Sequence, residues 1–439
     1  MNTGSLCRPR AAWLALWLIV VVTWVGCGDN EPAYPEQVKP AGGGAAARGS
    51  GGKVAVGTTA AGGAGIGGLG TGGFIETGAT VAGATGIAGA ATSAVTGAPS
   101  AGAGNQACST PPAASRVVGW AAVAGNGLET TTGGGDATPL VVKSFAELQT
   151  HVAGTLAEVI YVQGVIAPGN LIVGSNKTIV GLCGAELHGH VHLSGSVNVV
   201  LRNIKVVGYG VGDCTLDPSF DATVGCSSGN DAISVLNNAH HIYIDHCDIS
   251  DGTDGNLDIT NGADFVSVSY TKFHYSLRTD LVGNDATGQA GHRFSNLVGG
   301  TDTPTYSDAT SLNVTWHHNW WADGVMQRMP RVRFGKNHLF NNLYTSTGNG
   351  HCVRAGIQGQ ILIENTVFRA SNNPQQFNST TDQKTANITA SSSENLYLGT
   401  TGTIATGGGG PAFTTAPYPY QLDLASEVEE TVKRDAGPQ

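Results

Sequence analysis

Short β-rich runs recur along the chain at a nearly constant interval, and this period constrains the fold more than any other feature. Each run is followed by a polar residue or cysteine in an equivalent slot. From Cys247 onward these slots are separated by 24, 25, 23, 23 and 23 residues, and Asn203 precedes Cys247 by 44 residues, which corresponds to two turns. The slots are held by Asn203, Cys247, Thr271, Asn296, Asn319, Asn342 and Asn365.

A repeat of this length indicates stacked units, each of which buries its apolar face only against its neighbours. Because the runs are strand-like and no helical periodicity lies between them, the sequence predicts an all-β fold, a right-handed parallel β-helix. The recurrent asparagines are expected to form an internal ladder between coils. Residues 141–152 are expected to form a capping helix at the N-terminal end, with Ser144 as N-cap and Glu147 completing a capping box.

The chain begins with a segment that is typical of an export signal. Two arginines precede the apolar residues 11–25, a stretch shorter than the about 20 residues needed to span a bilayer. Residues 25–28 (VGCG) resemble a bacterial lipoprotein cleavage site, with Cys27 as the lipidated residue. Residues 1–27 are therefore predicted to be a signal peptide of lipoprotein type, and the protein is expected to be extracellular or anchored at the outer surface.

The segment after the signal has too few core-forming residues for a folded unit. Gly contributes 65 of the 439 residues, and 25 of these lie in the first 110 residues. Between Val54 and Ser115 the only charged residue is Glu76. We interpret residues 28–115 as a flexible Gly/Ala-rich linker. The β-helix domain is expected at residues 116–400, and residues 401–439 are expected to pack on it or to trail from it.

The global charge excludes one class of partner. The formal net charge is −10 and only 12% of residues are charged, which does not favour binding to nucleic acid. A polyanionic substrate would have to meet a local basic patch. The chain is expected to act as a monomer.

Export permits disulfides among the six cysteines that follow the leader. Cys214 and Cys226 bracket a short polar loop and are the first candidates for a pair. The sequence contains no Cys-x-x-Cys pair and no His-rich cluster of the zinc type.

Three clusters carry candidate chemistry, and the first is acidic. Asp245, Asp251, Asp254 and Asp258 lie within 14 residues. Dense carboxylates repel one another unless a cation neutralises them, and oxygen-only ligands favour a hard cation such as Ca²⁺. The spacing is not that of an EF-hand loop, and a solvated acidic turn is the alternative.

The second cluster is basic and occupies residues 327–336. Arg328, Arg331 and Arg333 suit carboxylate recognition, because a guanidinium offers a bidentate fork. Pro330 indicates an edge or a bend that exposes the preceding Arg328. A solvated basic strand is the alternative.

The third cluster is the aromatic and histidine run at residues 316–321 (WHHNWW), one coil before the basic run. Adjacent strand residues point to opposite faces, so His317 and His318 are interpreted as hydrogen-bonded structural residues rather than as a metal site.

Together these segments resemble the polysaccharide lyase family that contains the pectate lyases and pectin lyases. The resemblance covers about residues 141–368. It is carried by residues 231–233 (DAI) with 242–247 (IYIDHC), 254–258 (DGNLD), 266–270 (VSVSY), 328–335 (RMPRVRFG) and 341–344 (NNLY).

The resemblance implies a secreted pectate lyase that cleaves α-1,4-linked polygalacturonate by Ca²⁺-assisted β-elimination. It implies Asp245, Asp254 and Asp258 as calcium ligands. It also implies that Arg328 takes the C5 proton and that Arg333 holds a substrate carboxylate.

The chain departs from the family where a lysine usually follows the VSY strand. Arg278 stands in the lysine position of residues 278–285, and Arg293 lies one residue out of register in residues 292–299. Arg278 is therefore a catalytic candidate, and Arg293 and Arg331 are substrate-binding candidates. The missing lysine favours pectin lyase action on methylated pectin, whereas the aspartate trio favours pectate.

Two further interpretations belong to other classes of protein. A polygalacturonase hydrolase on the same fold would need Asn-x-Asp and Gly-His-Gly segments, which are not evident. A non-catalytic β-solenoid that binds polyuronate would use the same acidic and basic patches without cleaving the polymer.

Overall fold

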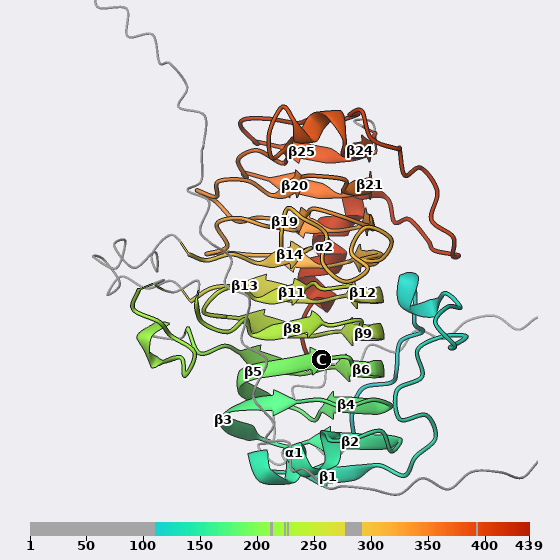
Figure 1. Ribbon diagram of the computed structural model, residues 1–439, viewed down its shortest axis with the longest axis vertical. Coiled ribbons are helices and arrows are strands. Elements are labelled where there is room, and N and C mark those ends of the chain that lie inside the picture. The colour runs from blue at the N-terminus through green and yellow to red at the C-terminus, as the bar shows by residue number, and fades with distance from the viewer. Residues whose placement is uncertain (1–109, 211–213, 224, 226–227, 277–291, 392–393) are drawn as a thin grey trace, which may run out of the picture. The chain divides into compact units, whose positions relative to one another are not determined.

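Every strand pair of the main sheets in the computed structural model is parallel, and successive strands in the chain go to different faces of one column of coils (Figure 1). The structure describes residues 110–439 apart from 211–213, 224, 226–227, 277–291 and 392–393. The predicted signal peptide and almost all of the predicted linker therefore lie outside the described residues. Parallel crossovers are right-handed, so the fold is the predicted right-handed parallel β-helix.

One face of the column is a ten-stranded sheet whose strands stack in chain order. Its strands are β1 (Leu140–Val142), β2 (Glu158–Val162), β4 (Lys177–Gly181), β6 (Val197–Arg202), β9 (His240–Asp245), β12 (Asp264–Ser269), β15 (Val314–His317), β18 (Lys336–Phe340), β21 (Gln360–Glu364) and β24 (Asn387–Ala390).

The other two faces are the arms of a fifteen-stranded sheet joined at β5 (Glu186–Ser194), which also pairs with β3 (Val165–Ile172). The first arm continues with β8 (Ile233–Leu236), β11 (Leu257–Ile259), β14 (Asn296–Val298), β17 (Arg331–Val332), β20 (Val353–Ala355) and β23 (Gln375–Phe377). The second arm continues with β7 (Lys205–Val207), β10 (Asp248–Ser250), β13 (Lys272–His274), β16 (Trp320–Trp321), β19 (Leu343–Tyr344), β22 (Val367–Arg369) and β25 (Leu396–Leu398).

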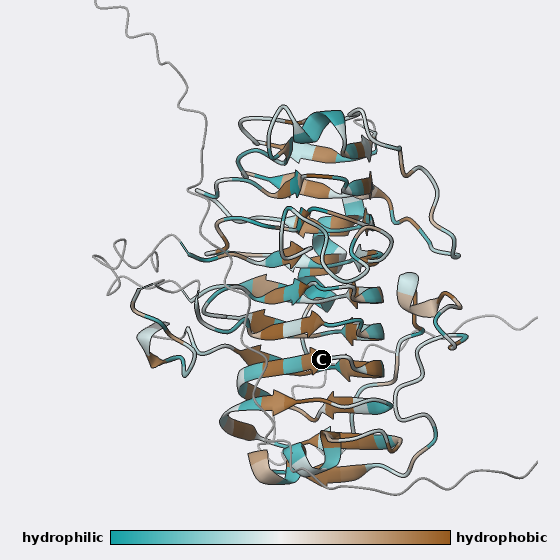
Figure 2. Ribbon diagram, in the orientation of Figure 1, coloured by the Kyte–Doolittle hydropathy of each residue, from teal (hydrophilic) through white to brown (hydrophobic). Residues whose placement is uncertain are grey.

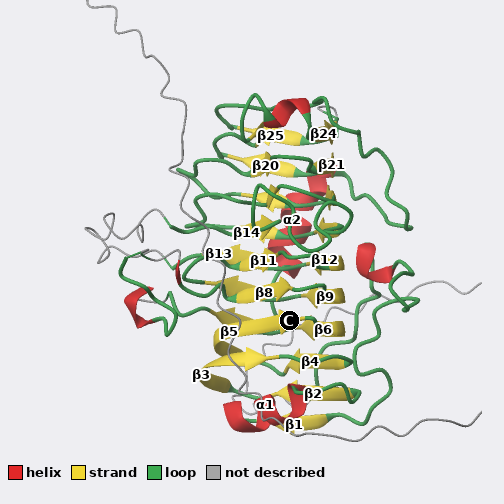
Figure 3. Cartoon of the chain, viewed as in Figure 1, coloured by secondary structure: helices red, strands yellow, loops and turns green. Residues whose placement is uncertain are grey.

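Helices are few and short, as Figure 3 shows. The N-terminal cap α1 (Phe145–Val152) begins after β1, later than predicted, because residues 140–142 join the first sheet. Ser144 Oγ accepts a hydrogen bond from the Glu147 backbone N–H at 3.3 Å, as the capping box predicts. The other helices are η1 (Trp120–Ala122), η2 (Cys214–Leu216), η5 (Asp382–Lys384) and α2 (Ala425–Asp435). None of the helices among the described residues has the length and apolar content that a membrane crossing requires.

The interior is built from in-register apolar side chains, and the strands carry most of the hydrophobic colour in Figure 2. Phe273, Trp321, Tyr344, Phe368 and Tyr397 form one stack across successive coils of the second arm, with ring centroids 4.5–5.5 Å apart. Each aromatic ring covers the ring of the coil before it, so the stack excludes water along the axis of this arm.

The predicted polar ladder exists, but with fewer members. The backbone N–H of Thr271 donates to Asn319 Oδ1 at 3.0 Å, and that of Asn319 donates to Asn342 Oδ1 at 2.9 Å. Asn203 and Asn365 lie outside this ladder, one position earlier in the turn, where both have positive φ.

The prediction was wrong about the number of coils. β6 pairs directly with β9, and β12 pairs directly with β15, so residues 203–247 and 271–319 are each one coil rather than two. Asn296 accordingly belongs to β14 on another face, not to the ladder. Long excursions leave the column at one corner without disturbing strand pairing, so spacing alone counted them as extra coils.

Both ends of the described chain lie against the ten-stranded sheet. Near the start, Ser115 Oγ donates to the Asp245 carboxylate, so packing begins before the predicted boundary at residue 116. Near the end, Tyr418 hydrogen-bonds His338 Nδ1 at 2.9 Å, and His318 pairs with Asp423 at 3.0 Å. His318 also hydrogen-bonds His317, so the histidine run is structural, as predicted. Residues 401–439 pack on the domain rather than trail from it.

The last helix covers the second arm. Val428 and Val432 of α2 are fully buried against Leu343 and Val367. These four side chains form an apolar cluster of their own outside the main core, so α2 shields the outer face of β19 and β22.

Removing this apolar contact should destabilise the fold. We expect Val428→Ala and Val432→Ala together to lower the free energy of unfolding by about 3 kcal/mol, since each loses about two buried methylene equivalents. Thermal melting of the two variants measures this, and Glu430→Ala on the exposed side of α2 is the matched control. An unchanged melting temperature in the double variant would show that α2 does not cover the sheet in solution.

Candidate active site

Three carboxylates meet on the first arm of the fifteen-stranded sheet. Asp231, Asp254 and Asp258 each place one carboxylate oxygen within 4.8 Å of the others. Asp231 lies two residues before β8, Asp254 lies in the turn before β11, and Asp258 lies on β11, the next strand of the column (Figure 1). Among the described residues this is the one cluster of His, Cys, Asp and Glu side chains that could hold a metal ion.

Neighbouring groups hold each carboxylate in place. Ser234 Oγ donates to Asp231 Oδ2 at 2.7 Å, and the Leu297 backbone N–H donates to Asp258 Oδ1 at 3.0 Å. His292 Nε2 lies 2.8 Å from Asp254 Oδ1. Asp231 is therefore oriented from within its own coil, and Asp254 and Asp258 are oriented by residues of the next coil.

A glycine keeps the space between two of the carboxylates open. A Cβ at Gly255 would lie only 3.1 Å from Asp231 Oδ1 and 3.2 Å from Asp258 Oδ1. Any larger residue would crowd these oxygens, so the DGNLD turn needs glycine at this position.

The electrostatics of the cluster are unfavourable for three bare carboxylates. Burial, followed by the charge of Asp254, raises the pKa of Asp258 from 3.8 to about 7. The charges of Arg328 and then Arg333 lower the same pKa and partly offset the effect. A divalent cation would relieve this repulsion, and oxygen-only ligands suit a hard cation such as Ca²⁺.

The structure does not place Asp245 with Asp254 and Asp258, contrary to the prediction. Asp245 ends β9 on the ten-stranded sheet, where its carboxylate accepts from Ser269 Oγ at 2.6 Å and lies 2.9 Å from His246 Nδ1. The chain turns two corners between Asp245 and Asp254, so closeness in sequence was misleading. Asp231 takes the place in the cluster instead. It lies 23 residues before Asp254, one repeat away, and that spacing could have identified it.

Arg328 lies next to the cluster at the start of the β17 coil. It has φ +61°, and its Cζ lies 4.2 Å from the centroid of the Phe294 ring. Its backbone N–H donates to His351 Nε2 at 3.3 Å. Burial and the charges of Arg354, Arg331 and Arg328 hold the pKa of His351 well below its usual value, so a neutral imidazole accepts this bond.

The other two arginines of the basic run are buried. Arg333 donates from Nε to Asp302 Oδ1 at 2.7 Å and from Nη1 to the Gly299 carbonyl at 2.8 Å, which holds the loop after β14. Arg331 lies on β17, where it pairs in register with Leu297 on one side and Arg354 on the other. One register position on successive strands of this arm is therefore occupied by Asp258, Leu297, Arg331 and Arg354.

The remaining predicted residues are less informative. Arg278 and Cys226 lie outside the described residues, as does the side chain of Cys214, so the Cys214–Cys226 disulfide stays a prediction. Arg293 directly precedes Phe294, and its carbonyl accepts from the Met326 backbone N–H at 2.8 Å.

Sequence reasoning assigned no role to four residues that the structure brings to the site: Asp231, His292, Phe294 and His351. Asp231 could have been found from the repeat. The other three are placed by the loops between coils, whose course no periodic signal predicts.

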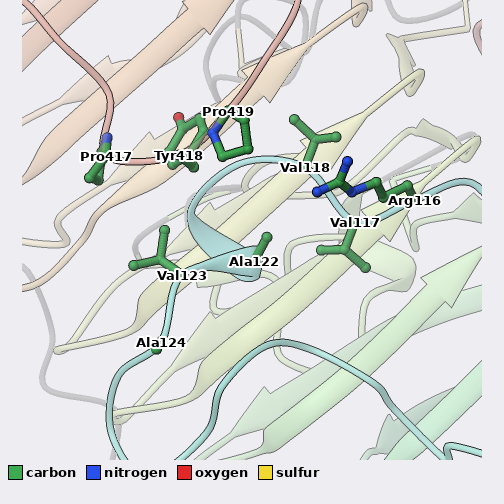
Figure 4. Close-up of a pocket in the computed structure, with 9 residues that line it drawn as sticks. All are labelled: Arg116, Val117, Val118, Ala122, Val123, Ala124, Pro417, Tyr418 and Pro419. Carbon is green, nitrogen blue, oxygen red and sulfur yellow. The ribbon is translucent and has the colours of Figure 1, made fainter. Parts of the chain in front are cut away.

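A cavity of about 250 Å³ lies elsewhere, between the two terminal segments (Figure 4). None of the acidic or basic residues of the site lines it. Its walls are Arg116, Val117, Val118, Ala122, Val123, Ala124, Pro417, Tyr418 and Pro419.

Comparison with known proteins finds relatives that are named pectate lyases. Pectate lyase A of Aspergillus niger is 31% identical over 318 residues, which cover 70% of this chain and 84% of that protein. The pectate trisaccharide-lyase of Thermotoga maritima is 33% identical over 239 residues, or 53% of this chain and 57% of that protein, so the match spans less than two thirds of its length.

Solved structures agree at the level of the fold. A Bacillus pectate lyase in complex with trigalacturonate superposes with a TM-score of 0.52 at 20% identity, covering 73% of this chain and 98% of that one. The pectate lyase family model matches residues 69–439, beginning within the predicted linker. On these grounds the chain belongs to the pectate lyase family of polysaccharide lyases.

Proposed function

We propose that this protein cleaves α-1,4-linked polygalacturonate, the backbone of pectin, by Ca²⁺-assisted β-elimination to 4,5-unsaturated oligogalacturonides. The observation that carries the proposal is the meeting of an oxygen-only cluster, Asp231, Asp254 and Asp258, with Arg328 and Arg333. Both arginines are close enough to lower the pKa of Asp258. A site with acidic and basic halves suits a polyanion that is held partly through a cation and partly by guanidinium groups.

Calcium, when held by Asp231, Asp254 and Asp258, supplies positive charge beside the substrate carboxylate and thereby acidifies the C5 proton. Arg328 takes that proton in its neutral guanidine form, because the protonated guanidinium has no lone pair to accept it. The C5–H electron pair forms the C4=C5 double bond as the C4–O bond breaks, and the departing oxygen takes a proton from water.

The remaining arginines hold substrate carboxylates. Arg333, Arg331 and Arg293 flank Arg328 in the same part of the first arm and the loop before it. Arg278 follows β13 in sequence and replaces the family lysine, as a further catalytic candidate. A polymer lying along the arm meets the carboxylates on two adjacent coils and the arginines on later coils. A monomer, in which one chain supplies all of these groups, is part of the proposal.

The substrate assignment is supported by the relatives, which are named for pectate and include a complex with trigalacturonate. Pectin lyase action on methylated pectin is the alternative that the missing family lysine favours. Export by residues 1–27, a lipid anchor at Cys27 and an extracellular or outer-surface location complete the proposal.

One assay tests the function. Polygalacturonate and highly methylated pectin are compared with and without chelator, and the ultraviolet absorbance of the conjugated product is followed. We expect absorbance from polygalacturonate that chelator abolishes. Preference for methylated pectin would indicate a pectin lyase, and binding without absorbance would indicate a polyuronate-binding solenoid.

The calcium ligands can be tested by comparing two aspartates. We expect Asp231→Asn to weaken Ca²⁺ binding at least about tenfold, because it removes a charged ligand from the cluster. Asp245→Asn should leave Ca²⁺ affinity unchanged and lower the melting temperature instead, since Asp245 bonds Ser269 and His246. Calorimetric titration with Ca²⁺ distinguishes them, and the reverse pattern would restore Asp245 as the ligand.

The raised pKa of Asp258 predicts how Ca²⁺ affinity depends on pH. Bound Ca²⁺ needs the ionised carboxylate, so affinity should fall about tenfold per pH unit below about 7. When chelator removes Ca²⁺, the stability of the fold depends on pH in the opposite sense. A raised folded-state pKa stabilises at low pH and the contribution is lost as pH rises through about 7, so Asp258→Asn should melt above wild type at pH 8.

Equal melting temperatures at pH 8 for wild type and Asp258→Asn in chelator would contradict the raised pKa. Asp248→Asn on the second arm serves as a carboxylate control away from the cluster.

Arg328 should be needed for turnover rather than for binding. We expect Arg328→Ala and Arg328→Lys each to lower kcat by about 10²–10⁴-fold, because a lysine keeps the charge but loses the planar fork and its reach. KM should change little, since Arg333 remains, and Lys336→Ala on the exposed edge of the same coil should match wild type. If Arg328→Lys raises KM and spares kcat, Arg328 only binds, and Arg278 or Arg293 becomes the candidate base.

A further inference from the structure

The aromatic ring of Phe294 lies against the guanidinium of Arg328. The distance of 4.2 Å from Arg328 Cζ to the ring centroid is well within the range of a cation–π contact. Phe294 is 9% exposed, so the contact is largely shielded from water. Shielding strengthens the attraction between the positive charge and the ring face.

Arg328 needs such a support because, among the described residues, few other contacts fix its side chain. Its backbone is in the left-handed region, which few non-glycine residues adopt, and this sets the direction in which the side chain leaves the coil. Its Nε is buried and has no hydrogen-bond partner among the described residues. Among the residues that the structure describes, the ring of Phe294 is therefore the contact that sets the plane of the Arg328 guanidinium.

Phe294 is itself held firmly by its main chain. Its carbonyl accepts from Tyr275 Oη at 2.7 Å and from the Asn256 backbone N–H at 3.2 Å. Phe294 also forms a parallel bridge with Gln327, the residue before Arg328. The Phe294 main chain is thus anchored both to the turn that carries the carboxylates and to the turn that carries the arginine.

The neighbouring residue in the same segment extends the link to the acidic cluster. His292 lies 4.3 Å from the Phe294 ring, between centroids, and its Nε2 lies 2.8 Å from Asp254 Oδ1. Asp254, His292, Phe294 and Arg328 therefore form one continuous line of contacts across the site.

We propose that Phe294 is a positioning residue that orients the Arg328 guanidinium relative to the carboxylate cluster. The inference rests on the proposed function, since orientation matters for the step assigned to Arg328. The ring attracts the charged form of the side chain and therefore does not help to deprotonate it, so the contribution of Phe294 to catalysis is to the geometry of the guanidinium. Small misplacements of a reacting group are costly: about 1 Å can reduce turnover about 10²-fold.

The test compares Phe294→Leu, which keeps an apolar side chain but loses the ring face, with Phe294→Tyr, which keeps the ring. We expect Phe294→Leu to lower kcat by roughly 10- to 100-fold with KM and the Ca²⁺ dissociation constant within about twofold of wild type. Phe294→Tyr should restore kcat to within about threefold. Phe368→Leu, in the interior stack between Tyr344 and Tyr397, is the control that loses stability without losing kcat.

A second readout does not depend on activity. In the full chain labelled with ¹⁵N-arginine, the Arg328 Nε–H signal, assigned by its loss in Arg328→Lys, should be shifted upfield by the ring current. This shift should vanish in Phe294→Leu and persist in Phe294→Tyr. If wild type forms no unsaturated product, the proposed function fails while this measurement still tests the contact.

Two results would overturn the inference. One is wild-type kcat in Phe294→Leu. The other is an Arg328 signal without any ring-current shift in the wild-type protein.

Discussion

The parallel hydrogen-bond ladder between coils is the constraint on which the rest of the structure depends. Each strand satisfies its backbone N–H and C=O groups from the strands one coil away, about 4.8 Å above and below. Side chains in register are therefore placed directly over one another. That alignment produces the aromatic stack from Phe273 to Tyr397. It also lets the buried Asn342 side chain accept a hydrogen bond from the backbone N–H of Asn319, one coil before it.

The same alignment builds the candidate active site. Asp231 and Asp254 come from turns one coil apart, and the row from Asp258 through Leu297 to Arg331 crosses three adjacent strands. Burial, followed by the charge of Asp254, raises the pKa of Asp258, and the nearby arginines offset only part of that effect. The fold tolerates this local repulsion because the ladder and the interior stacks, not the site, hold the coils together.

Polar residues have different roles on different faces of the column. On the ten-stranded sheet, Asp245, His318 and His338 bind the two ends of the described chain through Ser115, Asp423 and Tyr418. On the first arm, aspartates and arginines converge instead. The face on which a strand lies decides which groups surround its carboxylates. Asp245 therefore holds a terminal segment, whereas Asp231, Asp254 and Asp258 belong to the candidate site.

The sequence by itself determined the existence of a repeat, the parallel β-helix, the capping helix, the family, and the presence of Asp254, Asp258 and Arg328 in one site, because periodic burial and short motifs are local properties. Only the tertiary structure decided that Asp245 faces another sheet, that Asp231 completes the cluster and that Phe294 lies against Arg328. It also decided that two long segments are single coils. The physical reason is that loops leave the column at its corners: their length does not alter strand pairing, so no spacing in the sequence records where the chain returns.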